Sequence, residues 1–370
     1  MTGIIKHAMG SAILLNKPLA MLRLVFFVLL LVHGLIHLMG FVKAFDYARV
    51  AALTQNISRP QGLFWLFTSI LFIIAAVAFL WNNTNWPYLA FIAVLISQFL
   101  VIMVWKDARW GTLANFIILI TAIGAWGTSR FESRFRADVR SYAARTATLP
   151  APVITAESIQ HLPMPVQRYL RFSGVLNKPK VNSVRIVLEG EMRSRKGKWF
   201  PFRSVQYNFF EHPTRLFFMK GKMFGITVPG YHQYREEQAE MDVRLAGLVS
   251  LVHHKGPEMN KAETVTLFND MCMMVPATLT DERIQWEPVN DSMVKAVFTN
   301  GTQSVSATLY FNQEGAMVNF ISPDRFDVNE QKQFPFSTPV HSWQPIGGHT
   351  LFATGDAVWH YPDGEFIYGK

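Results

Sequence analysis

The chain of 370 residues has almost no cysteine and none of the common catalytic signatures. Cys272 is the only cysteine, so neither an intramolecular disulfide nor a thiolate metal cluster is possible. It lies in an apolar stretch, which favours burial over reactivity. The sequence also lacks a GxSxG nucleophile elbow, a P-loop and a GxGxxG fingerprint. We therefore expect no cofactor, and an enzymatic role has no motif to support it.

The chain has a net charge of +9, but its larger, C-terminal part is neutral. Residues 146–370 contain equal numbers of basic and acidic side chains, so the whole excess lies in residues 1–145. A nucleic-acid-binding domain needs a basic patch on its folded surface. The sequence therefore does not predict nucleic acid as a partner.

Charged residues are also missing from four long apolar runs in the first third of the chain. Each run is close to the 20 residues that a helix needs to cross the hydrocarbon core. The runs predict four transmembrane helices, with membrane lipids as partners, at about residues 22–42, 62–81, 87–105 and 110–126. The first run has no small-x-small cleavage site after it, so we expect it to stay uncleaved.

The connections predict an up-down bundle with both ends of the helical part on one side. Basic residues near these ends favour the cytoplasm for that side, whereas the compact basic turn at 106–109 favours the opposite orientation. The side that carries the C-terminal domain therefore stays open, with a preference for the cytoplasm.

Three regions follow from this pattern: a four-helix transmembrane domain at 1–129, a basic juxtamembrane helix and linker at 130–154, and a β-rich domain at 155–370. Phe131, Phe135, Val139 and Tyr142 recur at helical spacing with arginines between them. This spacing predicts a helix in the headgroup layer whose arginines reach toward the lipid phosphates.

Residues after 181 alternate between apolar and polar side chains, which is typical of strands. About ten short strands are expected, with one continuous strand over 231–243 and a hairpin at Asn300-Gly301. Apolar spacing over 262–274 predicts a helix. The fold class is an α-helical membrane bundle followed by an α+β, mainly antiparallel domain, with a curved sheet packed on one or two helices.

Four short motifs carry a resemblance to a known family. They are LPMPVQRYL at 162–170, GPEM at 256–259, and GDAVW at 355–359 with DGEFIY at 363–368. Residues 155–370 resemble an uncharacterised bacterial membrane-anchored family, a domain of unknown function. The resemblance implies a bacterial inner membrane as the location and no established activity.

Two histidines interrupt the first apolar run. His33 and His37 are spaced i, i+4 and project from one helix face. Ionisable residues inside a membrane are candidates for metal binding or proton transfer. The alternative is that His33 and His37 face the interior of the bundle and form hydrogen bonds with Thr68, Ser97, Gln98 or Asn115 on other helices. The other three runs contain no histidine, so haem between the helices is not expected.

Acidic and histidine residues between 253 and 281 are the only candidates for chemistry in the β-rich domain. His253, His254, Glu258 and Glu263 suggest a loose metal cluster, but no HExxH spacing is present. No metal site is therefore assigned. The carboxylates at 258–281 would serve as general acid and base in a membrane-proximal enzyme; these are Glu258, Glu263, Asp270 and Asp281.

The favoured function is binding of a lipid or another apolar ligand. The stripe formed by Val265, Phe268, Met271 and Cys272 is expected to lie against the concave side of the sheet. Large apolar residues of the strands, Phe209, Phe217 and Phe224, would face it. A partly filled cleft would then offer Phe268, Met271, Phe217 and Phe224 to the ligand. An interaction module that recruits a partner through sheet edges is a third possibility.

Overall fold

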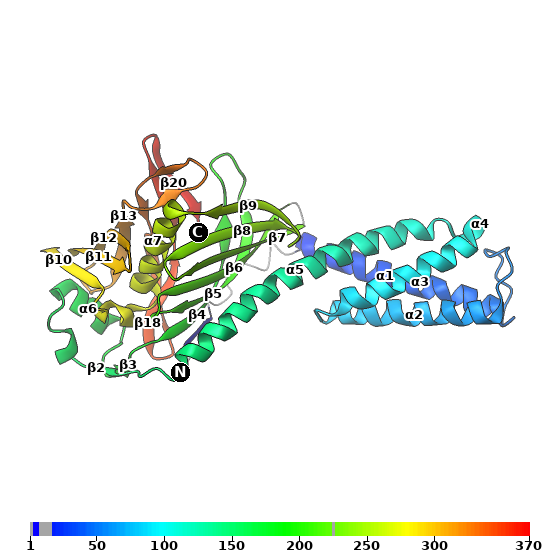
Figure 1. Ribbon diagram of the computed structural model, residues 1–370, viewed down its shortest axis with the longest axis horizontal. Coiled ribbons are helices and arrows are strands. Elements are labelled where there is room, and N and C mark those ends of the chain that lie inside the picture. Colours follow the sequence, from blue (N-terminus) through cyan, green and yellow to red (C-terminus); the bar gives the residue numbers. More distant parts are fainter. Residues whose placement is uncertain (1–2, 7–16, 224–225) are drawn as a thin grey trace. The chain divides into compact units, whose positions relative to one another are not determined.

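A computed structural model describes residues 3–6, 17–223 and 226–370, which group into two compact units (Figure 1). The helical unit comprises Met9–Phe131 and Ala246–Leu248. The β unit comprises Met1–Ala8, Glu132–Leu245 and Val249–Lys370. One long helix, α5, contributes to both units, because it runs without a break from Gly111 to Thr146.

The helical unit contains four helices that are long and apolar enough to span a membrane. They confirm the four runs read from the sequence. The fourth helix continues about five turns beyond its apolar part. The helices of this unit are α1 (Lys17–Ala44), α2 (Arg59–Leu80), α3 (Trp86–Met103), the one-turn α4 (Trp105–Ala108) and α5 (Gly111–Thr146).

Small residues let α1 and α2 approach each other closely. A Cβ atom added at Gly40 would lie 2.2 Å from Cδ2 of Trp65, and one at Gly34 would lie 2.9 Å from Cβ of Phe72. Apolar burial does not drive helices together in lipid, so such close packing supplies the attraction. Ser58 and Gln61 form a reciprocal capping box at the start of α2, with Pro60 between them.

Among the residues that the structure describes, the β unit is built on a 14-stranded sheet in which every pairing except β1 with β4 is antiparallel. Its path is β10-β11-β12-β13-β16-β19-β20-β4-β5-β6-β7-β8-β9, with β1 pairing in parallel with β4. The strands of this sheet are β1 (Gly3–Lys6), β4 (Ser183–Met192), β5 (Phe200–Phe209), β6 (Thr214–Met223), β7 (Ile226–Arg235), β8 (Gln238–Leu245), β9 (Val249–Lys255), β10 (Ile284–Asn290), β11 (Met293–Asn300), β12 (Gln303–Phe311), β13 (Met317–Ser322), β16 (Phe336–Ser337), β19 (Ala357–Tyr361) and β20 (Gly364–Gly369).

Smaller elements surround this sheet. Three short pairings lie outside it, and a few helical segments connect its parts. These elements are β2 (Val153–Ile154) with β3 (Lys178–Pro179), β14 (Phe326–Asp327) with β15 (Lys332–Gln333), β17 (Val340–Ile346) with β18 (His349–Gly355), the 3-10 helices η1 (Glu157–Ile159) and η2 (Pro276–Thr280), and the α-helices α6 (Met164–Phe172) and α7 (Pro257–Met274).

Two hairpins differ from the sequence expectation in an informative way. The strand predicted over 231–243 is two strands, because Glu236 and Glu237 both adopt positive φ and form a two-residue turn. Positive φ is uncommon for glutamate, so the turn carried no sequence signal. The predicted hairpin after β11 is present, but its turn residues are Gly301 and Thr302. Strand β9 was not predicted.

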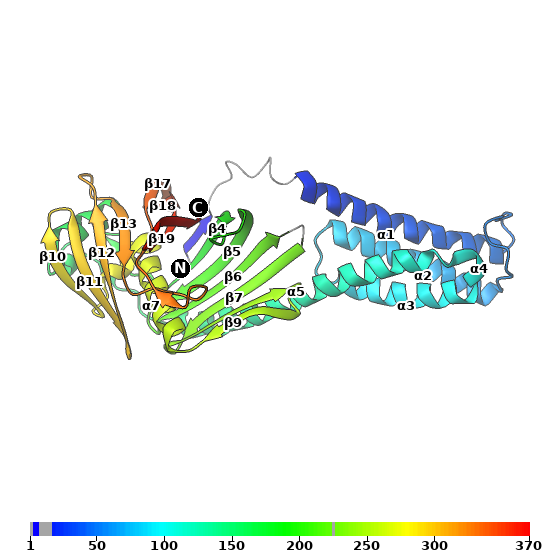
Figure 2. The ribbon, with the colours of Figure 1, turned by 90° about the horizontal axis from the view of Figure 1, so that it is seen from above.

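Helix α7 lies between two halves of the sheet, β4–β9 and β10–β13, in both views of the ribbon (Figures 1 and 2). The halves are joined by short pairings only, since β16 contributes two residues and β20 meets β4 at a single register pair. Most of α7 is buried as a result. The helix therefore supplies core contacts to both halves.

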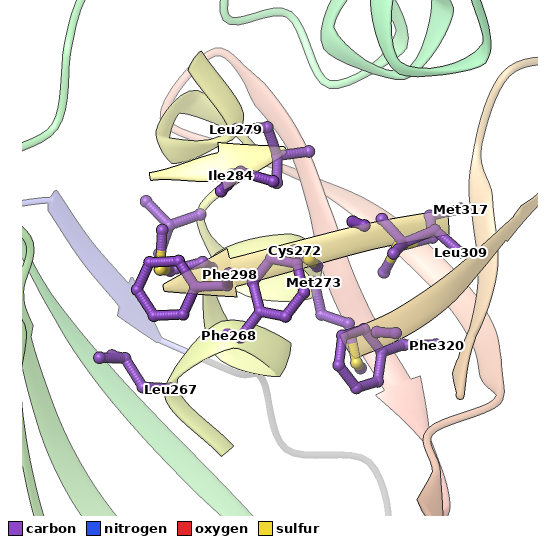
Figure 3. Packing of buried hydrophobic residues seen from close by; sticks show 14 of the residues in the cluster. Leu267, Phe268, Cys272, Met273, Leu279, Ile284, Phe298, Leu309, Met317 and Phe320 are labelled. Atoms are coloured by element: carbon purple, nitrogen blue, oxygen red, sulfur yellow. The ribbon is translucent and has the colours of Figure 1, made fainter. Parts of the chain in front are cut away.

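The apolar face of α7 packs against β11 and β13. Phe268 stacks on Phe298 with ring centroids 5.3 Å apart and meets the edge of Phe320 at 5.7 Å. Figure 3 shows Phe268 between these two rings, with Cys272 and Met273 beside them. Phe268 has no exposed surface, so this side of α7 is a filled core.

Replacing Phe268 with alanine is expected to lower the free energy of unfolding by about 3–5 kcal/mol, because the stacked ring would leave a cavity. Chemical denaturation of the detergent-solubilised chain measures this loss. Val289→Ala is the matched control, since Val289 on β10 is 43% exposed. A loss at Phe268 no larger than at Val289 would contradict the filled core.

Candidate functional site

Three of the four residues predicted to bind an apolar ligand, Phe268, Met271 and Phe217, lie among the described residues. Phe268 and Met271 are buried in the α7 core. Phe217 lies on β6 beside His232, with ring centroids 5.4 Å apart, and is not part of that core cluster. Phe224 lies outside the described residues. Phe268 and Met271 are therefore enclosed by the core, and Phe217 lies outside that cluster.

The last turns of α5 pack on the outer face of the sheet, which is the face turned away from α7. The Phe135 ring lies 5.4 Å from Phe218 and 5.6 Å from Tyr231, and Tyr142 lies 5.6 Å from Phe209. Burial of these rings against the strands replaces the contact with headgroups that the sequence suggested for this segment. Phe209 consequently faces α5, not α7.

Polar contacts fix α5 to the neighbouring strand β7. The Tyr231 hydroxyl donates to Asp138 Oδ2 at 2.8 Å, and Arg235 NH1 lies 3.4 Å from Asp138 Oδ1. Burial and the hydrogen bond to Asp138 raise the pKa of Tyr231. The helix is therefore held in one position on the sheet by both apolar and charged groups.

A cavity of about 430 Å³ remains between α5 and strands β4, β5 and β6. Volumes of this size are typical of sites for small ligands. Its lining combines an apolar wall with five basic side chains and one acidic side chain; these residues are Phe135, Val139, Val205, Tyr207 and Phe218, then Arg136, Arg140, Arg185, Arg203 and Lys220, and Glu132.

The positive charge of this cavity is only partly compensated. Glu132 accepts a bond from Arg136 NH2 at 2.7 Å and pairs with Lys220. Burial opposes ionisation of Glu132, but these two cations hold its pKa below the usual value. Arg203 pairs with Glu189 at 3.1 Å. Within residues 17–223 and 226–370, the side chains of Arg140 and Arg185 have no ion-pair partner.

The inner face of the same strands carries a charged network that is fully paired. Arg215 on β6 reaches two carboxylates of α7, with Nε 2.8 Å from Asp270 Oδ2 and NH1 3.0 Å from Glu263 Oε2. Gln206 and Asn208 on β5 donate to the same Asp270 oxygen at 2.6 and 3.1 Å. All five side chains are buried, so the network joins α7 to the sheet.

This network accounts for two of the carboxylates considered for acid and base chemistry. Burial alone would raise the pKa of Glu263, but Arg215 and then His232 outweigh it and hold the value at about 2. A carboxylate so strongly ionised is a poor proton donor at neutral pH. Asp281 is bound by Arg283, and Glu258 is exposed. The four carboxylates do not converge on a common site.

The loose metal cluster suggested by the sequence is also dispersed. His253 lies on β9 and contacts Glu240 at 3.0 Å, whereas Glu263 faces Arg215. Among the described residues, no group of three or more His, Cys, Asp and Glu side chains is placed to hold a metal ion. Burial raises the pKa of Cys272 well above its usual value, which disfavours the reactive thiolate.

A polar network crosses the helical unit at His33 and His37. His33 Nε2 lies 2.9 Å from Asn115 Oδ1, and His37 Nε2 lies 2.9 Å from Ser97 Oγ. His37 Nδ1 also contacts the His33 carbonyl oxygen at 2.8 Å, so it must be the donor. Three helices, α1, α3 and α5, thus share one buried set of hydrogen bonds. Ser97 and Asn115 were among the hydrogen-bond partners that the sequence analysis predicted for these histidines.

Comparison with known proteins assigns the C-terminal part to a family. A family of unknown function, DUF6544, matches residues 152–370. The chain belongs to this family, as the resemblance of its short motifs suggested, and the match includes the whole sheet apart from β1. A search of curated proteins gives no match to the chain.

Acid should unfold the chain partly through Glu263. The low pKa of this group stabilises the fold above its ordinary pKa, near 4.5, and that contribution is lost as the pH falls toward 2. The loss from this group should be about 3 kcal/mol. Urea denaturation at several pH values compares wild type with Glu263→Gln, which removes this dependence. Glu258→Gln on the same helix is the control, and an unchanged pH slope in Glu263→Gln would refute the account.

Replacing His37 with leucine should weaken the helical unit by about 1–2 kcal/mol, because Ser97 loses one of its two hydrogen-bond partners and keeps only Asn115. Unfolding of the purified chain in mixed detergent micelles measures the effect, and the control is the exposed Leu35→Ala. The absorption spectrum is expected to lack a haem Soret band. A Soret band that disappears in His37→Leu would show that the histidines bind haem instead.

Proposed function

We propose that the β unit binds the anionic headgroup of a membrane lipid in the cavity between α5 and the outer face of the sheet. The observation that carries this proposal is the presence of two guanidinium groups in the cavity lining, Arg140 on α5 and Arg185 on β4, that have no carboxylate partner within residues 17–223 and 226–370. Arginine binds phosphate through two parallel N–H bonds. A phosphate placed between these groups would compensate charge that the protein itself leaves uncompensated.

The apolar part of the lining favours a lipid over a simple anion. Phe135 and Val139 of α5 face Val205 and Phe218 of the sheet across the same cavity. Ligand sites commonly combine such walls with a few orienting polar groups. A glycerol backbone or the first part of an acyl chain would fit against them. The ligand class agrees with the sequence-based hypothesis, but the proposed place is a different one.

Chain continuity supports a lipid as the source of the phosphate. Arg130 and Arg134 of α5 directly follow the apolar part of the fourth candidate membrane span, and Arg136 and Arg140 continue the same basic segment of the helix. Basic residues that directly follow a span meet anionic headgroups at high local concentration. Carboxylate catalysis has no comparable support, because Glu263 and Asp270 are both engaged by Arg215.

The double variant Arg140→Gln, Arg185→Gln is expected to lose most of its preference for phosphatidylglycerol over phosphatidylcholine. Lipid titration of the delipidated, detergent-solubilised chain, followed by its melting temperature, measures the preference, since a ligand that binds the native state raises the midpoint. Arg145→Gln on the same helix is the control, because Arg145 does not line the cavity.

Titrations with inorganic phosphate and with glycerol 3-phosphate distinguish a lipid headgroup from a soluble compound as the source of the bound phosphate. Stabilisation by either compound equal to that by phosphatidylglycerol would identify a soluble phosphate ligand in place of a lipid. If the preference for phosphatidylglycerol fell equally in the double variant and in Arg145→Gln, it would depend on the overall positive charge of the chain. That result would contradict the proposed site.

A further inference from the structure

The loop that joins β8 and β9 exposes an apolar segment. Residues 245–251 read LAGLVSL and contain no charged side chain. Leu245 and Leu248 are 39% and 41% exposed, and Val249 and Leu251 are 61% and 55% exposed. Contiguous exposed apolar residues at a hairpin end are unfavourable in water and mark an interaction surface.

Three residues of this loop, Ala246–Leu248, belong to the helical unit. A Cβ atom added at Gly127 of α5 would lie 2.5 Å from Cγ of Leu248 and 2.6 Å from the Ala246 carbonyl oxygen. A Cβ added at Gly247, whose φ is +72°, would lie 2.4 Å from the Gly127 carbonyl oxygen. Both positions require glycine, because backbone touches backbone there.

The contact point on α5 lies where the apolar stretch of the helix ends. No charged residue occurs from Gly111 to Ser129, and Arg130 is the first after it. The Arg130 guanidinium carbon lies 5.7 Å from the centre of the Trp126 ring. Tryptophan and arginine at the end of a span are typical of the membrane interface. Gly127, between them, is therefore at the interface in the spanning arrangement.

We propose that the loop 245–251 inserts into the interface of the bilayer that the four helices span. The occupant of its exposed apolar surface is lipid, because the loop touches α5 at the level of the lipid headgroups and upper acyl chains. Leu248 anchors the loop on the helix, while Val249 and Leu251 contact lipid.

Fluorescence quenching by lipid tests this proposal in the full chain. Val249→Cys and Leu251→Cys are labelled with a bimane maleimide and reconstituted in phosphatidylcholine vesicles with or without acyl chains that carry a doxyl quencher. Unmodified chain shows whether buried Cys272 reacts. Val289→Cys is the matched control, because Val289 is an exposed apolar strand residue outside this loop.

Loss of fluorescence at positions 249 and 251, with little loss at position 289, is the expected result. Equal quenching at all three positions would overturn the proposal. A label at 249 that is shielded from water but not quenched by doxyl lipid would also overturn it, because the loop would then be covered by protein. Having two labelled positions keeps the test decisive if one variant folds poorly.

Discussion

The burial of α7 between two halves of one sheet is the constraint on which the β unit depends. One side of the helix is apolar and meets β11 and β13 through Phe268. The other side carries Glu263 and Asp270, which are too costly to bury without a cation. Arg215 supplies that cation from β6, and Gln206 supplies an acceptor for its remaining N–H group.

The two faces of strands β5 and β6 differ in how their charges are compensated. On the inner face, Arg215 has two carboxylate partners and the amides of β5 complete the hydrogen bonds. The side chains of this network satisfy one another's charges and hydrogen bonds, and the network fixes the helix on the sheet. On the outer face, Arg140 and Arg185 line a cavity and have no ion-pair partner in the described part of the chain. Uncompensated charge next to open volume is the physical difference that points to binding on that face.

Much of the architecture could be predicted from the sequence. The four spans follow from run length and missing charge, and α7 follows from its apolar spacing. The Glu236-Glu237 turn could not be found, since neither residue favours positive φ. The course of α5 was misread, because Phe135 and Tyr142 have the same spacing whether they face lipid or a sheet.

The candidate sites depend on contacts that are distant in sequence, and this is why they were missed. Arg185 and Arg140 line the same cavity only because β4 lies beneath α5 in the fold. Gln206 and Asn208 did offer a signal, because these polar residues alternate with Val205, Tyr207 and Phe209 along one strand. Polar residues on a buried face need partners, and Glu263 and Asp270, seven residues apart on one helix face, were available.

The central claim is that the basic cavity beneath α5 holds an anionic lipid. Native mass spectrometry of the full chain, released gently from detergent after purification from its membrane, tests this most directly. The account predicts one retained lipid with a phosphate-bearing, net negative headgroup, and loss of that adduct in the Arg140→Gln, Arg185→Gln variant but not in Arg145→Gln. A chain that retains no lipid, or retains zwitterionic and anionic lipids in proportion to their abundance, would contradict it.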